Sequence, residues 1–325
     1  MKTANISVDL EKVDLEISSI LHPPAPFLSG ISRQVPRDGG KKRRGRLIVI
    51  LGRLLGAHPR DLDGTAAAVE VIHLATLIHD DVIDSAPRRR SRPTLQRKHG
   101  AAPAILYGDI LFSRGIARVN RIGNRDLTDL LLKTVGALCA GEILENQLAW
   151  KFPWTEKDYL EVATLKTASL FEYSCRAPAI LAGLSQRRLN ILSRFGRNLG
   201  LSYQAFDDCL DFMPGGDKAG KDRLADLKNG VPSLPVIFAG RDGVLREELK
   251  KKLRAGLTAR EAGSLARSIR ERGYLREARE QANNYLKAAR RAGRIIGQWG
   301  DRRFAMLLES YLEEHAAAFG VTEEC

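Results

Sequence analysis

The sequence has few of the features that mark secreted, membrane-spanning or zinc-binding proteins. Its 325 residues include only four cysteines, and no two of them form a Cys-x-x-Cys pair. No apolar run approaches the ~18 to 20 residues of a membrane span. The first twenty residues are acidic and amphipathic, unlike a signal peptide. We therefore expect a cytoplasmic protein with reduced thiols and no transmembrane segment.

Linkers and common catalytic motifs are also absent from the sequence. No stretch rich in proline, glycine and serine divides the chain, so a single domain over residues 1–325 is predicted. No Ser/His/Asp or Cys/His arrangement supplies a nucleophile, and there is no Walker lysine loop. Aromatic residues make up only 6%, whereas Ala, Leu, Arg, Glu and Lys recur with a helical period. This composition predicts an all-α fold.

An acidic turn follows an apolar helix pattern near residue 80, and Pro87 marks a stop soon afterwards. Asp80 and Asp84 are four residues apart and share one helix face, with Asp81 about 100° round the helix. Like charges at this spacing repel, and the C-terminal end of a helix is already partly negative. A cation is therefore expected to compensate these charges.

The same arrangement occurs again far downstream, where Asp207, Asp208, Asp211 and Pro214 repeat the spacing of Asp80, Asp81, Asp84 and Pro87. A single acid-rich turn would ordinarily be a solvated helix end, but two copies with matching prolines favour a shared function. Carboxylate oxygens on two helix ends suit a hard cation that keeps waters and takes other ligands from phosphate. Mg²⁺ fits that description.

The formal net charge of +13 calls for an anionic partner or a solvated basic surface. Basic clusters at residues 41–46 and 88–92 flank the first acidic turn, and a third at 287–294 is interpreted as a solvated helix face. A nucleic-acid groove would not place carboxylates beside its basic residues, whereas a site for metal-bridged diphosphates would. Nucleic acid is therefore not the predicted partner.

Helices are expected over about 5–20, 65–84, 103–121, 127–150 and 187–212, and from about 234, 244, 258, 272 and 300. Another helix begins at Thr155 with a capping box in which Asp158 replaces the usual glutamate, and it carries Lys166 at its middle. A lysine among apolar neighbours is ordinarily a surface residue. The stretch 214–235 is long enough to act as a lid.

Together these features predict a reaction class. Two metal-binding carboxylate clusters surrounded by arginine and lysine suit diphosphates, and metal charge makes diphosphate a good leaving group. The apolar helix leading into the first acids suggests that the rest of the substrate is a hydrocarbon. We expect ionisation of a C–O bond to diphosphate in a cavity that keeps water from the carbocation.

In the order and spacing of its motifs, the chain resembles the trans-polyprenyl diphosphate synthases. The resemblance runs from about Gly39 to Pro235 and rests on GGKKRR, HDDVID, RRSRPT, GE, KT, YQAFDDCLD, GKD, DL and SLP. It implies a helical bundle with a central cavity, of the isoprenoid synthase type. The implied reaction is sequential head-to-tail condensation of isopentenyl diphosphate onto an allylic prenyl diphosphate. The implied assembly is a homodimer, or a pair with a small subunit.

The resemblance also implies roles for individual residues. Three Mg²⁺ ions would be bound by Asp80, Asp84 and Asp207, and metal-bound waters by Asp81, Asp208 and Asp211. The allylic diphosphate would contact Arg89, Lys166 and Lys221, and isopentenyl diphosphate would contact Lys41, Arg44, His73 and Arg90. Thr167 and Gln204 would offer dipoles to the allylic cation.

Some positions depart from the family pattern. Gly45 stands where proline is usual, which loosens the basic loop. Glu145 stands where glutamine is common, and it either adds negative charge near the metals or faces outward. The C-terminus also lacks the basic tail that often closes the site.

The expected product length follows from what lies beneath the first acidic turn. Ala75 and Thr76 are small where members with short products carry aromatic plugs, and Ile72 is a checkpoint about one turn deeper. Products longer than geranylgeranyl, in the hexa- to octaprenyl range used for quinone side chains, are therefore predicted. Ala75→Phe is expected to shorten them.

Other interpretations stay open. A geranylgeranyl or farnesyl diphosphate synthase, or the catalytic subunit of a two-component heptaprenyl diphosphate synthase, would share these motifs. A terpene cyclase shares the first acidic motif, but DDCLD argues against it. A basic nucleic-acid binder would show salt-sensitive DNA binding that is indifferent to Mg²⁺.

Overall fold

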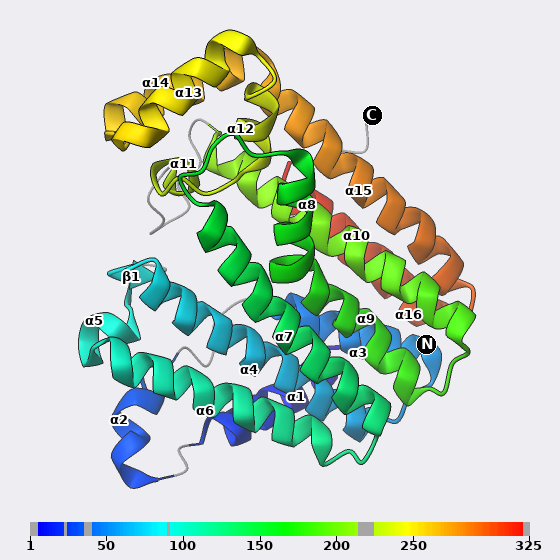
Figure 1. The fold of residues 1–325 in the computed structure, drawn as a ribbon. Helices are drawn as coiled ribbons and strands as arrows, with labels where there is room; N and C mark the ends of the chain where they lie inside the picture. The colour runs from blue at the N-terminus through cyan, green and yellow to red at the C-terminus, as the bar shows by residue number, and fades with distance from the viewer. Residues whose placement is uncertain (1–5, 23–24, 36–40, 90–91, 214–223, 321–325) are drawn as a thin grey trace. The chain divides into compact units, whose positions relative to one another are not determined.

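The structure is a computed structural model that describes residues 6–22, 25–35, 41–89, 92–213 and 224–320. Helices make up almost all of its secondary structure (Figure 1). The strands among these residues are β1 (Arg88–Arg89) and β2 (Arg92–Pro93), which pair antiparallel. The predicted all-α fold is confirmed. No described helix is both long and apolar enough to cross a membrane.

The chain forms two compact units, each assembled from separated stretches of sequence. Unit 1 comprises Met1–Thr134, Tyr173–Ser193 and Ala292–Tyr311, and unit 2 comprises Val135–Glu172, Arg194–Arg291 and Leu312–Cys325. The first acidic turn belongs to unit 1 and the second to unit 2. Neither unit is a contiguous segment, and a single domain over the whole chain stays a prediction.

Unit 1 is built around α4 (Pro59–Ile83), which packs against α1 (Ile6–Leu21), α3 (Arg43–Leu55) and α6 (Ala101–Asn120). Almost every residue of α4 from Leu62 to Ile72 is buried. α6 runs beside α4 (Figure 1) and approaches it closely at two glycines. A Cβ atom on Gly115 would lie 2.9 Å from Ile72, and one on Gly108 would lie 2.2 Å from the His79 ring. This packing fixes the helix that ends in the first acidic turn.

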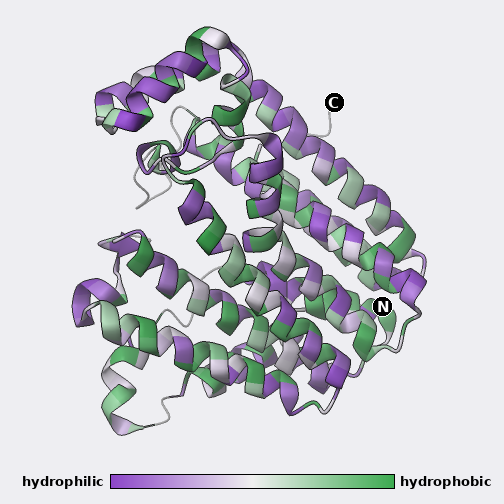
Figure 2. Cartoon of the chain, in the orientation of Figure 1, coloured by the Kyte–Doolittle hydropathy of each residue, from purple (hydrophilic) through white to green (hydrophobic). Residues whose placement is uncertain are grey.

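Short elements complete the N-terminal half: η1 (Pro26–Leu28), α2 (Ser29–Ser32) and α5 (Leu95–His99). The remaining helices, in chain order, are α7 (Arg125–Leu148), α8 (Glu156–Ala163), α9 (Ser169–Leu181), α10 (Gln186–Asp211), α11 (Ala225–Lys228), α12 (Leu234–Ala239), α13 (Gly243–Ala255), α14 (Ala259–Glu271), α15 (Tyr274–Gly297) and α16 (Arg302–Ala318). α14 buries Ala262, Leu265 and Ile269 at helical spacing, while much of α14 and α15 is polar (Figure 2).

The helix predicted from Thr155 begins as expected and is then interrupted. Thr155 N–H donates to Asp158 Oδ2 at 2.8 Å, and Asp158 N–H donates to Thr155 Oγ1 at 3.1 Å, which confirms the capping box. A π-helical turn, η2 (Thr164–Ala168), separates α8 from α9. α10 packs closely against it, because a Cβ atom on Gly200 would lie 2.5 Å from Ala168 Cα.

The cysteines of the described chain form no disulfide. Cys175 and Cys209 are buried free thiols, and Cys139 is an exposed one. Their reduced state stays a prediction. Cys325 lies outside the described residues.

A carboxylate joins α4 to the start of α3 in unit 1. Glu70 Oε1 accepts the Gly45 N–H at 2.7 Å, and this amide has no partner within the first turn of α3. Proline at position 45 would lack this donor. The departure at Gly45 therefore supplies a hydrogen bond that proline could not make. Burial raises the pKa of Glu70, while the Gly45 hydrogen bond and the Arg44 charge oppose the shift.

We expect Glu70→Gln to make the stability of the protein less dependent on pH. A carboxyl with a higher pKa in the folded chain keeps its proton longer there. The wild-type protein therefore loses stability as pH rises from the unfolded pKa, near 4.5, through the folded pKa. Glutamine still accepts from Gly45 and has no charge to desolvate. Melting temperatures are measured between about pH 4 and pH 8. The melting temperature of Glu70→Gln should rise relative to that of wild type as pH rises. A difference between the two that does not change with pH would contradict this.

Candidate active site

The first acidic turn lies at the C-terminal end of α4, as predicted. Asp80 and Asp81 belong to the last turn, and Asp84 caps the helix with its N–H donating to Asp80 O at 2.8 Å. Asp81 is buried, with 7% of its surface exposed, whereas Asp80 is half-buried and Asp84 is exposed. The first and third acids of the motif are thus the ones that solvent reaches most readily.

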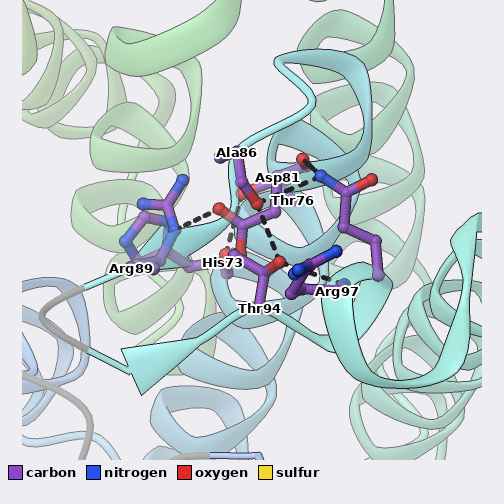
Figure 3. Close-up of polar contacts among 8 residues, drawn as sticks. His73, Thr76, Asp81, Ala86, Arg89, Thr94 and Arg97 are labelled. Atoms are coloured by element: carbon purple, nitrogen blue, oxygen red, sulfur yellow. Dashed lines mark hydrogen bonds and ion pairs between the residues drawn. The ribbon is translucent and has the colours of Figure 1, made fainter. Parts of the chain in front are cut away.

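The β1–β2 hairpin and the residues after it fold back over this turn (Figure 3). Arg89 Nε donates to Asp81 Oδ1 at 2.7 Å, and the Thr94 hydroxyl donates to Ala86 O at 2.8 Å. Burial raises the pKa of Asp81, and the charge and hydrogen bond of Arg89 oppose that shift. Arg89, a predicted diphosphate ligand, is therefore held beside the acidic turn by Asp81.

The predicted residues beneath the acids fall on two faces of α4. His73 and Thr76 share the Asp80 face by helical period, and the Thr76 hydroxyl donates to His73 O at 2.8 Å (Figure 3). Ile72 and Ala75 are fully buried on another face. Ile72 packs against α6 at Gly115, and the helical period places Ala75 on the same side. Thr76, and not Ala75, therefore shares the face of the acids.

The predicted basic residues at the start of α3 lie in unit 1. Lys41 is exposed and Arg44 is half-buried, and Lys42 between them has a left-handed backbone with φ of 42°. The Lys42 ammonium forms an ion pair with Asp14 of α1. The other two predicted basic ligands, Arg90 and Lys221, lie outside the described residues, as does the first part of the predicted lid, residues 214–223.

The second acidic turn closes α10 in unit 2, with Asp211 as its last residue. Asp208 is buried, with 2% of its surface exposed, and it accepts the Gln204 amide at 2.8 Å and the Leu234 N–H at 3.2 Å. Burial raises the pKa of Asp208 to about 7, although these hydrogen bonds oppose the shift. Asp207 and Asp211 are half-buried. The second acid of each motif is therefore the buried one.

A fourth carboxylate of unit 2, that of Asp226, interacts with the acids of this turn. Burial raises the pKa of Asp226, on α11, well above its ordinary value, and the charges of Asp211, Asp208, Asp207 and Glu145 raise it further. Sequence reasoning noted the DL pair but gave Asp226 no role. The sequence did not predict this repulsion, because Asp226 comes close to these acids only in the folded chain.

Lys166 and Thr167 lie in the π-helical turn η2 of unit 2. Lys166 Nζ pairs with Glu142 Oε2 at 2.7 Å and also with Glu145. The Thr167 hydroxyl donates to Gln204 Oε1 at 2.6 Å, so Gln204 links Thr167 to Asp208. A Cβ atom on Gly141 would lie 2.6 Å from Lys166 N, which shows how closely α7 approaches. The structure thus brings together three residues that the sequence placed in one site.

The donor set fits a divalent cation that is shared with a substrate. Within the described ranges, no three His, Cys, Asp or Glu side chains form a ready-made metal site. Each acidic turn offers oxygen ligands only, with Asp81 held by Arg89 and Asp208 by amide donors. Mg²⁺ keeps several waters and binds through one or two carboxylates plus phosphate oxygens. The more exposed acids of each turn can supply such carboxylates.

Comparison with known protein families matches residues 25–268 to the family described as polyprenyl synthetase. A geranylgeranyl diphosphate synthase of Methanosarcina mazei is 30% identical over 306 residues, which cover 92% of this chain and 94% of that protein. An octaprenyl diphosphate synthase of Escherichia coli is 31% identical over 235 residues, which cover 72% of this chain and 73% of that protein.

A solved structure gives the same picture at the level of the fold. It is a polyprenyl synthase from Caulobacter crescentus, complexed with calcium and isoprenyl diphosphate. Its TM-score to this chain is 0.88 with 27% sequence identity, and the match covers 98% of this chain and 96% of that one.

Proposed function

The chain belongs to the polyprenyl synthetase family, and from this premise we propose that it is an all-trans polyprenyl diphosphate synthase. It condenses isopentenyl diphosphate head-to-tail onto an allylic prenyl diphosphate. One observation carries the proposal beyond family membership. Both acidic turns lie at helix ends, and each buries its second aspartate while leaving the first and third more exposed.

We assign three of the more exposed acids, Asp80, Asp84 and Asp207, to holding Mg²⁺, which would neutralise charge on the leaving diphosphate. Asp81 and Asp208 are held by Arg89 and by amide donors, so they keep the shape of each turn. Arg89 and Lys166 bring positive charge to the diphosphate, while Lys41, Arg44 and His73 serve isopentenyl diphosphate.

The carbon–oxygen bond of the allylic substrate then breaks, and the double bond of isopentenyl diphosphate forms the new carbon–carbon bond. Gln204 is fixed in orientation, because its oxygen accepts from Thr167 and its nitrogen donates to Asp208. Such fixed dipoles stabilise a cation without reorganising. The released diphosphate takes the proton that is lost from the new product, so no side-chain base is needed.

We propose products longer than geranylgeranyl. The two relatives described above differ in the product that their names give, so the proposal rests on residues of this chain. Thr76 is a small side chain on the same face of α4 as Asp80, one helical turn deeper. A hydrocarbon that grows from a diphosphate at Asp80 can therefore pass this position.

Asp80→Ala and Asp207→Ala are each expected to lower prenyl transfer by at least about 100-fold. Each removes a proposed Mg²⁺ ligand and so weakens the stabilisation of the diphosphate charge that develops in the transition state. The assay supplies isopentenyl diphosphate, Mg²⁺ and each allylic primer, and sizes the extracted lipids. Asp129→Ala, an exposed acid on α7, is the matched control and should keep wild-type turnover. Wild-type protein that makes no lipid product would refute the proposal, while unchanged circular dichroism shows that the variants fold.

Thr76→Phe is expected to shorten the products, because the ring fills the face of α4 beneath Asp80. Thr76→Val, of nearly equal volume, is the control and should leave the product length unchanged. The lengths are read by chromatography of the dephosphorylated lipids. Identical products from Thr76→Phe and wild type would remove Thr76 from the path of the chain. Ala75→Phe is a poorer test, because Ala75 lies on the face of α4 that packs against α6.

We also propose that the protein forms a homodimer through α6 and α7. Large apolar side chains are exposed on both helices, namely Ile105, Leu106, Leu132 and Ile143. Leu132 and Ile143 are eleven residues apart and so share one face of α7. Large apolar side chains that a helix leaves exposed are removed from water when a second copy covers them.

Sedimentation velocity is expected to show a dimer for the wild type and a monomer for Leu106→Glu, because the new charge would have to be desolvated in the interface. Leu15→Glu, the same substitution at an exposed leucine on α1, should stay dimeric. A dimeric Leu106→Glu variant would exclude this surface of α6. A monomeric wild type that turns over only with an added small subunit would support a two-component synthase instead.

A further inference from the structure

The ammonium of Lys166 is bound by two carboxylates. Lys166 Nζ lies 2.7 Å from Glu142 Oε2 and also pairs with Glu145 Oε2. The side chains are largely buried, with 29% of Lys166, 16% of Glu142 and 17% of Glu145 exposed. The structure therefore decides between the two interpretations of Glu145 left by the sequence, since this side chain faces the proposed diphosphate ligand.

Glu142 and Glu145 are two carboxylates that face one ammonium. The charge of Glu145 also acts on the acids of unit 2, because it raises the pKa of Asp226. A glutamine at position 145 would leave one carboxylate for one ammonium and would repel the neighbouring acids less. The second carboxylate is therefore not explained by stability, because like charges in a poorly solvated region disfavour folding.

Glu142 has a second contact on its own helix. Its Oε1 accepts the Asn146 amide at 3.2 Å, so α7 fixes the position of Glu142. The Lys166 backbone is fixed as well, since α7 packs on it at Gly141. The part of Lys166 that is able to move is its flexible four-carbon stem, which carries a compact charge with three donors. A change of partner at Lys166 therefore needs movement of side chains only.

We propose that Glu145 is a positioning residue that holds the Lys166 ammonium until a metal-loaded diphosphate displaces it. This inference rests on the proposed function, because it takes Lys166 as a ligand of the allylic diphosphate. Free diphosphate carries several negative charges and is repelled by Glu145, whereas diphosphate that carries divalent cations is not. Diphosphate binding therefore depends on metal loading. Glu145 pairs with Lys166 again when the metal and the product diphosphate leave.

Glu145→Gln is the direct test. The variant is expected to lower KM for the allylic diphosphate by about threefold to fivefold, the upper end of the range for an exposed ion pair, without changing KM for isopentenyl diphosphate. In calorimetry, inorganic diphosphate should bind the variant more tightly than wild type, with the larger gain in the absence of Mg²⁺. Glu172→Gln removes an equally buried glutamate paired with Arg197 and should change none of these values.

A double-mutant cycle shows whether the effect passes through Lys166. In a Lys166→Met background, Glu145→Gln should improve the binding of inorganic diphosphate by a smaller factor than in the wild-type background, because only the direct repulsion by Glu145 is then relieved. Equal gains in both backgrounds would mean that Glu145 acts by direct repulsion and would overturn its role in holding Lys166. If Glu145→Gln fails to fold, Glu145→Asp replaces it. It shortens the reach by one methylene and should give a smaller gain of the same sign, and no gain would overturn the proposal.

The outcomes separate this inference from the proposed function. An enzyme that makes prenyl products but shows an unchanged or raised KM in Glu145→Gln overturns the inference alone. A raised KM together with a higher Mg²⁺ requirement would assign Glu145 to the metal instead. A protein that makes no prenyl product, yet shows the expected changes in binding of inorganic diphosphate, overturns the proposed reaction and keeps the Glu145–Lys166 pair.

Discussion

Negative charge gathered at the C-terminal ends of α4 and α10 is the constraint on which the rest of the structure depends. Each helix end already carries partial negative charge, and three aspartates are added to it. The protein compensates the buried acid of each turn itself, with Arg89 at Asp81 and with amide donors at Asp208. The first and third acids of each turn are the more accessible ones, so they can meet a ligand from solvent.

Rigid packing beneath each turn makes this arrangement tolerable. Glycines let helices approach closely where side chains would separate them, as at Gly115 between α6 and α4 and at Gly200 between α10 and η2. A carboxylate that repels its neighbours stays in place only if the backbone that carries it cannot relax. The same logic applies at Gly141, where close approach of α7 fixes the backbone of Lys166.

The sequence predicted those features that follow from period and spacing. The 3.6-residue repeat located α4, α7 and α10, and Thr155 with Asp158 located the capped start of α8. Period alone did not show which neighbour each face meets. The contact of Ile72 with α6 at Gly115, the two partners of Lys166 and the repulsion at Asp226 all depend on residues distant in sequence. The β1–β2 hairpin was also missed, because two-residue strands have no period to detect.

The π-helical turn η2 has a consequence for how this segment tolerates change. A π turn accommodates one residue more than an α-helix of the same rise, so it absorbs an extra residue between α8 and α9. Deleting one residue between Thr164 and Ala168 would restore regular winding and leave α8 and α9 nearly in phase. The residues that remain in the turn, Lys166 among them, would then face a different direction. In this stretch the number of residues determines the structure as much as their identity does.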